Sequence, residues 1–126
     1  MFEKRRYKRI VFREAIEFHV LPGGPAGHGV PLPSFGGCLS WDLSEGGLRF
    51  RAYSFIPLNT DLSVEFSIDH DQSVTLIARV VWVQKLPHSE QYNLGLEFAK
   101  TPQNIHGQRL LHRYLMKYLY PQRKSL

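Results

Sequence analysis

An alternation of apolar and polar residues recurs in short segments through the first hundred residues and constrains the fold most. Between positions 61 and 68 every second residue is apolar, from Leu62 to Ile68, and polar residues fill the positions between them. A period of two is typical of a strand with one buried face. The same pattern predicts strands at residues 10–20, 47–53, 74–82 and 92–98, with a shorter one at Cys38–Asp42.

No helical pattern interrupts these six segments, which favours a sandwich or a barrel. After residue 100 the period changes: Thr101-Pro102 suits a helix start, and Leu111 and Leu115 then share one helical face. The 126-residue chain is therefore predicted to be all-β with a C-terminal helix, as one domain over residues 1–126. We expect a basic N-terminal arm at 1–9, a six-stranded antiparallel β-barrel at 10–99 and a helix at 101–120.

Glycine and proline dominate the segment between the first two predicted strands. They account for ten of the sixteen residues from Pro22 to Gly37. This composition excludes regular structure, so the whole segment is predicted to be a loop.

Several protein classes are excluded by composition. A single cysteine, Cys38, cannot form an internal disulfide or a cysteine-based zinc site, and the six histidines show no metal-ligand spacing. No apolar run approaches the ~20 residues of a transmembrane helix, and the N-terminus lacks the apolar stretch of a secretory signal. We therefore expect a cytoplasmic domain with no metal and no cofactor.

The basic residues are concentrated at the two ends of the chain. Residues 1–9 hold five basic residues and one acidic residue, residues 10–98 hold five and ten, and residues 99–126 hold six and none. A protein that coats nucleic acid usually spreads its cations over the binding face. An acidic body with cations packed into Lys4–Arg9 instead suggests local binding of one anion.

Two short motifs carry the functional signal. Arg5 and Arg9 form an R-x-x-x-R segment before the first strand, and Asp42, Ser44 and Gly47 form a D-x-S-x-x-G segment between two strands. In this order, and with Asn93-Leu94-Gly95-Leu96-Glu97-Phe98 as a last strand, the chain resembles the PilZ family. Alone, the first motif is typical of a solvated basic arm and the second of a capped turn.

The resemblance implies that the chain binds cyclic di-GMP, a bacterial second messenger. Arginine can pair with phosphates and guanine edges and can stack on bases, and Asp42 can accept guanine N–H groups. Gly46 and Gly47 allow the backbone to approach a ligand closely. The predicted binding residues are Arg5, Arg6, Arg9, Asp42, Ser44, Gly46 and Gly47.

Three further residues remain open alternatives. Arg79 and Trp82 could form an auxiliary wall for base stacking, although Trp82 is in phase with Ala78 and Val80, which favours core packing. Arg9 and Arg13 repeat the R-x-x-x-R spacing, but Arg13 lies within the alternation of the first strand.

We therefore predict a receptor and not an enzyme, since no nucleophile–base pair, carboxylate pair or metal cluster is present. Cyclic di-GMP would neutralise the arm and order it over the Asp42–Gly47 turn, which would signal to an unidentified protein of a motility, pilus or exopolysaccharide system. One alternative is a PilZ-like interaction module that does not bind the nucleotide. A less favoured one is a small barrel that binds single-stranded nucleic acid; no nucleic-acid polymer and no transmembrane segment are expected.

Overall fold

The computed structural model describes residues 8–22, 35–69 and 71–119. Its elements, in chain order, are β1 (Ile10–Val11), β2 (Ala15–Val20), β3 (Phe35–Leu43), β4 (Gly47–Ala52), β5 (Asp61–Ile68), β6 (Gln72–Lys85), β7 (Tyr92–Phe98), the 3-10 turn η2 (Pro102–Asn104) and α1 (Ile105–Leu119).

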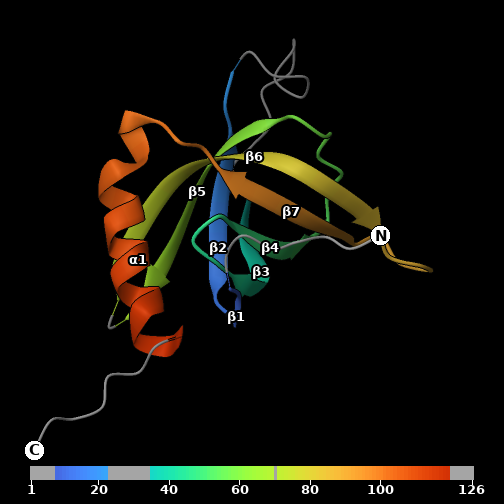
Figure 1. Cartoon of the computed structure of the whole chain (residues 1–126). Helices are drawn as coiled ribbons and strands as arrows, with labels where there is room; N and C mark the ends of the chain where they lie inside the picture. The colour runs from blue at the N-terminus through green and yellow to red at the C-terminus, as the bar shows by residue number, and fades with distance from the viewer. Residues whose placement is uncertain (1–7, 23–34, 70, 120–126) are drawn as a thin grey trace, which may run out of the picture.

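The strands form a closed antiparallel barrel (Figure 1). Hydrogen-bonded neighbours follow the order β3, β2, β5, β6, β7 and β4, and a further pairing of β4 with β3 closes the ring. The two-residue strand β1 lies outside this ring and pairs with the end of β3. The predicted six-stranded barrel with a C-terminal helix is confirmed.

The predicted strand at 10–20 is broken in the structure between β1 and β2. The cause is Ser40 on β3, whose hydroxyl accepts the N–H of Glu14 at 3.0 Å and lies 2.9 Å and 2.8 Å from the carbonyl oxygens of Phe12 and Glu14. These bonds replace ladder pairing where the chain bends. The bend lets β1 reach a different part of β3 from the part that β2 contacts.

Strand β3 is longer than the pattern predicted. It begins at Phe35, so the predicted loop from Pro22 to Gly37 ends before its last three residues, and residues 23–34 lie outside the described part of the chain. The predicted segment Cys38–Asp42 is the middle of this strand.

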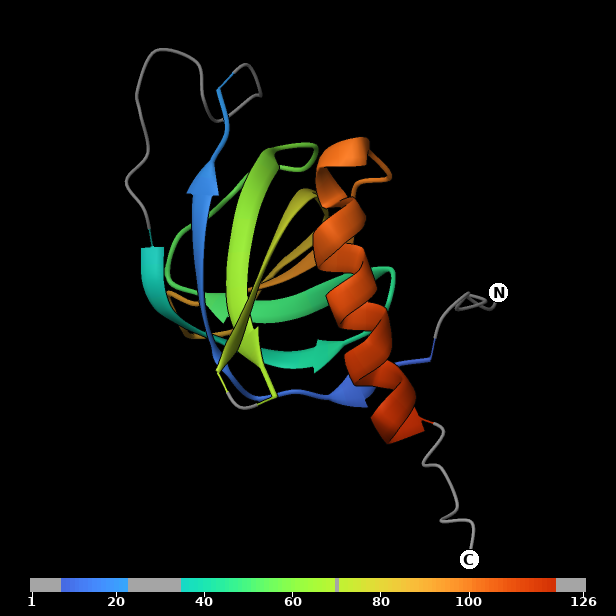
Figure 2. The same ribbon diagram turned by 90° about the vertical axis from the view of Figure 1, so that its left-hand side faces the viewer.

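Helix α1 runs down one side of the barrel (Figure 2) and is fixed at its start by Asn104. The buried Asn104 side chain accepts the N–H of Ile77 at 2.8 Å and donates to the carbonyl oxygens of Ile77 and Ala99 at 2.9 Å and 2.6 Å. The start of the helix is thus tied to β6 and to the residue after β7. Of the helices in the described ranges, none has the length and apolar character required to cross a membrane.

Aromatic rings join the helix to the barrel core. Phe12 packs edge-on against Phe66 at 5.6 Å and Tyr114 of α1 at 6.1 Å between ring centroids, and Phe66 stacks on Phe98 at 6.5 Å. Each such buried side chain contributes roughly 1.5–3 kcal/mol. Burial also raises the pKa of the Tyr114 hydroxyl to about 12, with a smaller effect from the adjacent Tyr118.

Candidate functional site

The turn between β3 and β4, which we call the signature turn (Asp42–Gly47), is closed by Ser44. The Ser44 hydroxyl accepts the N–H groups of Gly46 and Gly47, both at 3.2 Å, and the Ser44 N–H donates to the Gly47 carbonyl at 2.9 Å. A Cβ at Gly47 would lie 2.0 Å from the carbonyl oxygen of Leu96 on β7. Only glycine therefore fits there, and the turn is held against the neighbouring strand.

Arg9 and Asp42, 33 residues apart, meet beside this turn. Pairing of Val11 with Asp42 and of Ile10 with Leu43 brings the end of the N-terminal arm to β3. The Arg9 Nη1 donates to the Asp42 Oδ1 at 3.1 Å, and the Asp42 side chain is only 11% exposed. The structure thus joins the second arginine of the first motif to the aspartate of the second.

Arg49 is a further member of the site that the sequence analysis missed. Its Nε donates to the Asp42 Oδ2 at 2.7 Å, and its Nη2 contacts the same oxygen. Its guanidinium also stacks on Trp41, 4.4 Å from the ring centroid. The alternation of residues 47–53 showed only that the Arg49 side chain faces outward. The signal that could have identified Arg49 as a site residue is its position opposite Asp42 across the turn. We call Arg9, Trp41, Asp42 and Arg49 the arginine cluster.

The cluster continues across two more strands. In the strand register Asp42 lies opposite Arg49, Arg49 opposite Gly95, and Gly95 opposite Trp82, so the four residues form a row over β3, β4, β7 and β6. A Cβ at Gly95 would be 3.3 Å from the Cβ of Trp82, so the indole lies over the glycine. The row joins the arginine cluster to a second indole on the barrel exterior.

The prediction that Trp82 packs in the core is wrong. Its side chain is 38% exposed, because the register of β6 against β7 shifts between Val80 and Trp82. Such a bulge changes the face to which the following residue points. The indole is therefore available on the outside of the barrel, next to the row that leads to the cluster.

Arg79 is placed elsewhere. Its Nε and Nη2 donate to the two carboxylate oxygens of Asp61 on β5 at 2.9 Å and 3.4 Å. The hydrogen bond and the charge of Asp61 raise the pKa of Arg79. The side chain thus points toward β5, whereas the arginine cluster lies on the other side of β7. The structure does not bring Arg79 into the site.

Of the other predicted residues, Arg5 and Arg6 lie outside the described part of the chain. Arg13 is exposed and makes no hydrogen bond or ion pair with Asp42, whose partners are Arg9 and Arg49. Burial raises the pKa of the Cys38 thiol, which makes it a poor nucleophile at neutral pH. Within the described ranges, no three His, Cys, Asp or Glu side chains gather as a metal site.

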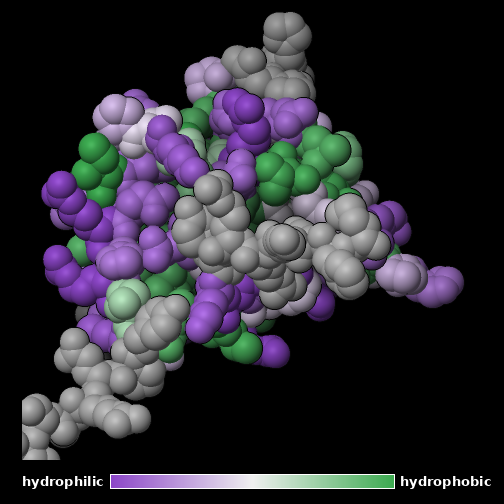
Figure 3. Space-filling view, in the orientation of Figure 1, coloured by the Kyte–Doolittle hydropathy of each residue, from purple (hydrophilic) through white to green (hydrophobic). Residues whose placement is uncertain are grey.

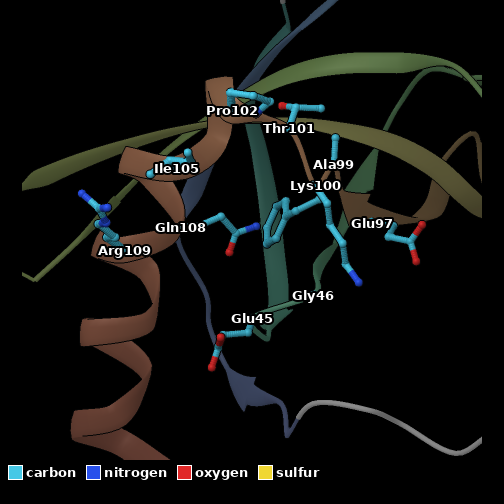
Figure 4. Close-up of a pocket in the computed structure, with 11 residues that line it drawn as sticks. Glu45, Gly46, Glu97, Ala99, Lys100, Thr101, Pro102, Ile105, Gln108 and Arg109 are labelled. Carbon is cyan, nitrogen blue, oxygen red and sulfur yellow. The ribbon is translucent and has the colours of Figure 1, made fainter.

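A pocket of about 560 Å³ lies on the other side of the signature turn (Figure 4). Glu45 and Gly46 of the turn form one wall, the end of β7 forms the floor, and the first turns of the helical segment form the opposite wall. Glu45 also contacts α1 directly, with its Oε1 2.9 Å from the Nδ1 of His112. The turn therefore has the arginine cluster on one side and the pocket on the other.

The described residues therefore form a small closed β-barrel domain with two arginines beside a glycine turn and no metal-ligand group. The sequence matches the PilZ domain family over residues 3–117, and the chain belongs to this family. Among proteins of curated function, none matches the sequence.

Solved structures share the fold at low sequence identity. The Bacillus subtilis inhibitor of motility MotI (DgrA) matches with a TM-score of 0.66 at 18% identity, over 97% of this chain and 55% of that one. Escherichia coli YcgR in complex with c-di-GMP matches with a TM-score of 0.67 at 16% identity, over 93% of this chain and 46% of that one. The PilZ domain of Escherichia coli YcgR with c-di-GMP matches with a TM-score of 0.60 at 15% identity, over 92% of this chain and 95% of that one. The chain spans about half the length of the first two proteins.

Proposed function

We propose that this PilZ domain is a receptor that binds cyclic di-GMP on the outside of the barrel. The observation that carries the proposal is the contact between Arg9 and Asp42, which joins the two motifs of the family at one place. The proposed binding residues are those of the motifs, Arg5, Arg6, Arg9, Asp42, Ser44, Gly46 and Gly47, with Arg49 added from the structure. The family membership and the c-di-GMP complexes of YcgR support this proposal.

The chemistry of the cluster suits a dianionic dinucleotide with flat bases. Arg9 and Arg49 are held in place by one carboxylate, so little side-chain entropy is lost when they pair with a phosphate or with guanine O6 and N7. The Asp42 Oδ1 accepts one bond from Arg9 and keeps a free lone pair for a guanine N–H. Each desolvated charge-assisted contact contributes about 1.5–3 kcal/mol.

Two aromatic surfaces are available for the bases. The Arg49 guanidinium already stacks on Trp41, and the outer face of this pair can receive a base in turn. Trp82, beyond Gly95, is the proposed auxiliary surface on the same row. Arg79, the other auxiliary candidate, would first have to leave Asp61.

The arm provides the proposed output. Between Lys4 and Arg9 five of six residues are basic, so a dianion bound at Arg9 would reduce their mutual repulsion and order the arm over the signature turn. The ordered arm would offer or remove a surface for a downstream protein. Slower amide exchange in Lys8–Val11 at saturating ligand is the expected result, and unchanged exchange there would contradict this switch.

Calorimetric titration of cyclic di-GMP into the full chain tests the binding itself. Expected is a Kd near micromolar or tighter, at least tenfold weaker in Arg9→Ala and unchanged in the control Arg13→Ala, which has the same motif spacing but lies away from Asp42. GTP serves as the control ligand. Absence of binding by the folded chain would favour an interaction module that does not use the nucleotide, and tight, salt-sensitive binding of oligonucleotides alone would favour the nucleic-acid alternative.

A further inference from the structure

The outward side of α1 carries cations and no acid. The helix Ile105–Leu119 contains Arg109, Arg113 and Lys117 at four-residue spacing and no Asp or Glu; we call these three residues the basic helix face. Lys117 pairs with Asp69 at 2.9 Å. Arg109 and Arg113 are exposed and have no ion-pair or hydrogen-bond partner among residues 8–22, 35–69 and 71–119. Figure 3 shows the polar side chains gathered over this helix.

The basic helix face adjoins the pocket beside the signature turn. The apolar part of the pocket lining consists of Phe98, Ala99, Pro102 and Ile105, and the Gln108 amide points into the pocket (Figure 4). Arg109 belongs to both features, since it lines the pocket edge while its guanidinium points to the outside of α1. The pocket volume of about 560 Å³ lies within the range of ~300–1,000 Å³ that is usual for binding pockets.

The rim of the pocket carries charges of both signs. Arg109 stands on the helix side, whereas Glu45, Glu97 and Lys100 stand on the barrel side, so the carboxylates outnumber the one lysine there. Glu45 contacts the Nδ1 of His112, whereas Glu97 has no ion-pair partner among the described residues. A polyanion laid over the pocket would meet these two carboxylates, which disfavours nucleic acid and an anionic membrane. A protein segment that carries its acidic side chains on one side can pair with the arginines and keep those side chains away from Glu45 and Glu97.

From this geometry we infer that the pocket and the basic helix face together form a docking site for an acidic, amphipathic protein segment. One large apolar side chain of the segment enters the pocket, and its acidic side chains pair with Arg109 and Arg113. These two arginines are one helical turn apart, about 6 Å along the axis. Acids four residues apart on a partner helix would match them, which is the helix-in-groove mode of recognition. The docking does not require cyclic di-GMP.

The test uses the full chain and a displayed library of random 12-residue peptides, followed by fluorescence anisotropy with the enriched peptides. We expect enriched sequences with a Leu, Phe or Trp flanked by acidic residues about four positions apart. Their affinity should fall at least tenfold in Arg109→Glu/Arg113→Glu and in Gln108→Trp, which fills the pocket. The affinity should change less than twofold in the control Lys85→Glu. This variant reverses an exposed charge at the end of β6, eight residues along the strand from Ile77, where the helical segment is attached.

Circular dichroism and urea unfolding show that each variant is folded. Enriched peptides without acids, or peptides that bind the Arg109/Arg113 variant as well as the native chain, would overturn the inference. So would the absence of any enriched peptide. Loss of binding in the charge variant but not in Gln108→Trp would remove the pocket from the site. Binding of vesicles with 30% phosphatidylglycerol that requires both arginines, with no peptide enriched, would assign the face to lipid instead.

Discussion

The arginine cluster and the basic helix face both present cations, but they hold them in opposite ways. Arg9 and Arg49 are about three-quarters buried and are fixed by a single buried carboxylate and an indole. Arg109 and Arg113 stand in solvent on a helix that packs its other, apolar side against the barrel. Fixed cations suit a small rigid ligand because their geometry is set before binding, whereas free cations suit a partner that can adapt to them.

The largest expected effects come from substituting two glycines, one in the signature turn and one in α1. We expect Gly47→Ala to cost about 3 kcal/mol or more, or to prevent folding, because the new Cβ would collide with the Leu96 carbonyl on a neighbouring strand. Gly107→Ala in α1 would meet Leu76 Cδ2 and the Thr75 carbonyl, both at 2.8 Å, but the helix can lift slightly and gains alanine propensity. A loss of about 1–2 kcal/mol is expected there. Urea unfolding measures both, and equal losses would contradict the difference in rigidity.

Substitution of Asp42 and of Asp69 compares the ion pairs of the two regions. Asp42→Ala leaves Arg9 and Arg49 partly buried without a counter-charge and should cost about 2 kcal/mol, with loss of cyclic di-GMP binding. The control variant Asp69→Asn breaks the exposed pair with Lys117, keeps a residue that tolerates the positive φ of 48° at this position, and should cost less than about 1 kcal/mol. Chemical denaturation and calorimetry on both variants check this. A larger loss from Asp69→Asn would mean that the helix attachment depends on charge.

Trp82 tests how far the ligand face extends. Its indole is more than half buried and packs over Gly95, so Trp82→Ala should lower the free energy of unfolding by about 1 kcal/mol. Loss of base stacking should weaken cyclic di-GMP five- to tenfold, a loss of about 1 kcal/mol. Calorimetry with Tyr53→Ala, an exposed aromatic on the β4–β5 connection, provides the control. Unchanged affinity in Trp82→Ala would limit the site to the arginine cluster.

The last expected effect is a pH dependence that belongs to the helix side and is absent at neutral pH. Burial raises the pKa of Tyr114 to about 12, above the value of about 10 in an unfolded chain. The unfolded state therefore loses this proton first, so the stabilisation is complete below pH ~10 and is lost as the pH rises toward 12. Urea unfolding between pH 9 and 12 should show a smaller decline in Tyr114→Phe than in the native chain. An identical decline would show that Tyr114 is not the titrating group.

The sequence predicted those parts of the fold that follow from a period of two. Strands β4, β5 and β7 were placed within a residue because their buried faces are continuous. The break at Phe12–Glu14 could not be predicted, since its cause is the hydroxyl of Ser40, 26 and 28 residues away. Trp82 was misplaced because a bulge shifts the phase of β6 within Val80–Val83, an apolar run in which alternation does not set the phase.

The candidate site was predictable where it consists of motifs and not where it depends on register. Asp42, Ser44 and Gly47 share one turn, so their spacing alone brings them together. Arg49 became visible only from the pairing of β3 with β4, and Arg109 only from the packing of α1 beside the turn.

The central claim is that cyclic di-GMP binds at the arginine cluster and the signature turn. A titration of the isotope-labelled full chain with the ligand, followed by amide NMR spectra, tests it residue by residue. We expect saturable shifts at Arg9, Ser44, Gly46 and Gly47 and in the side-chain Nε–H signal of Arg49, with unchanged signals for Tyr53 and Phe55 beyond the other end of β4. No shifts at saturating ligand, or shifts concentrated around Tyr53 and Phe55, would contradict it.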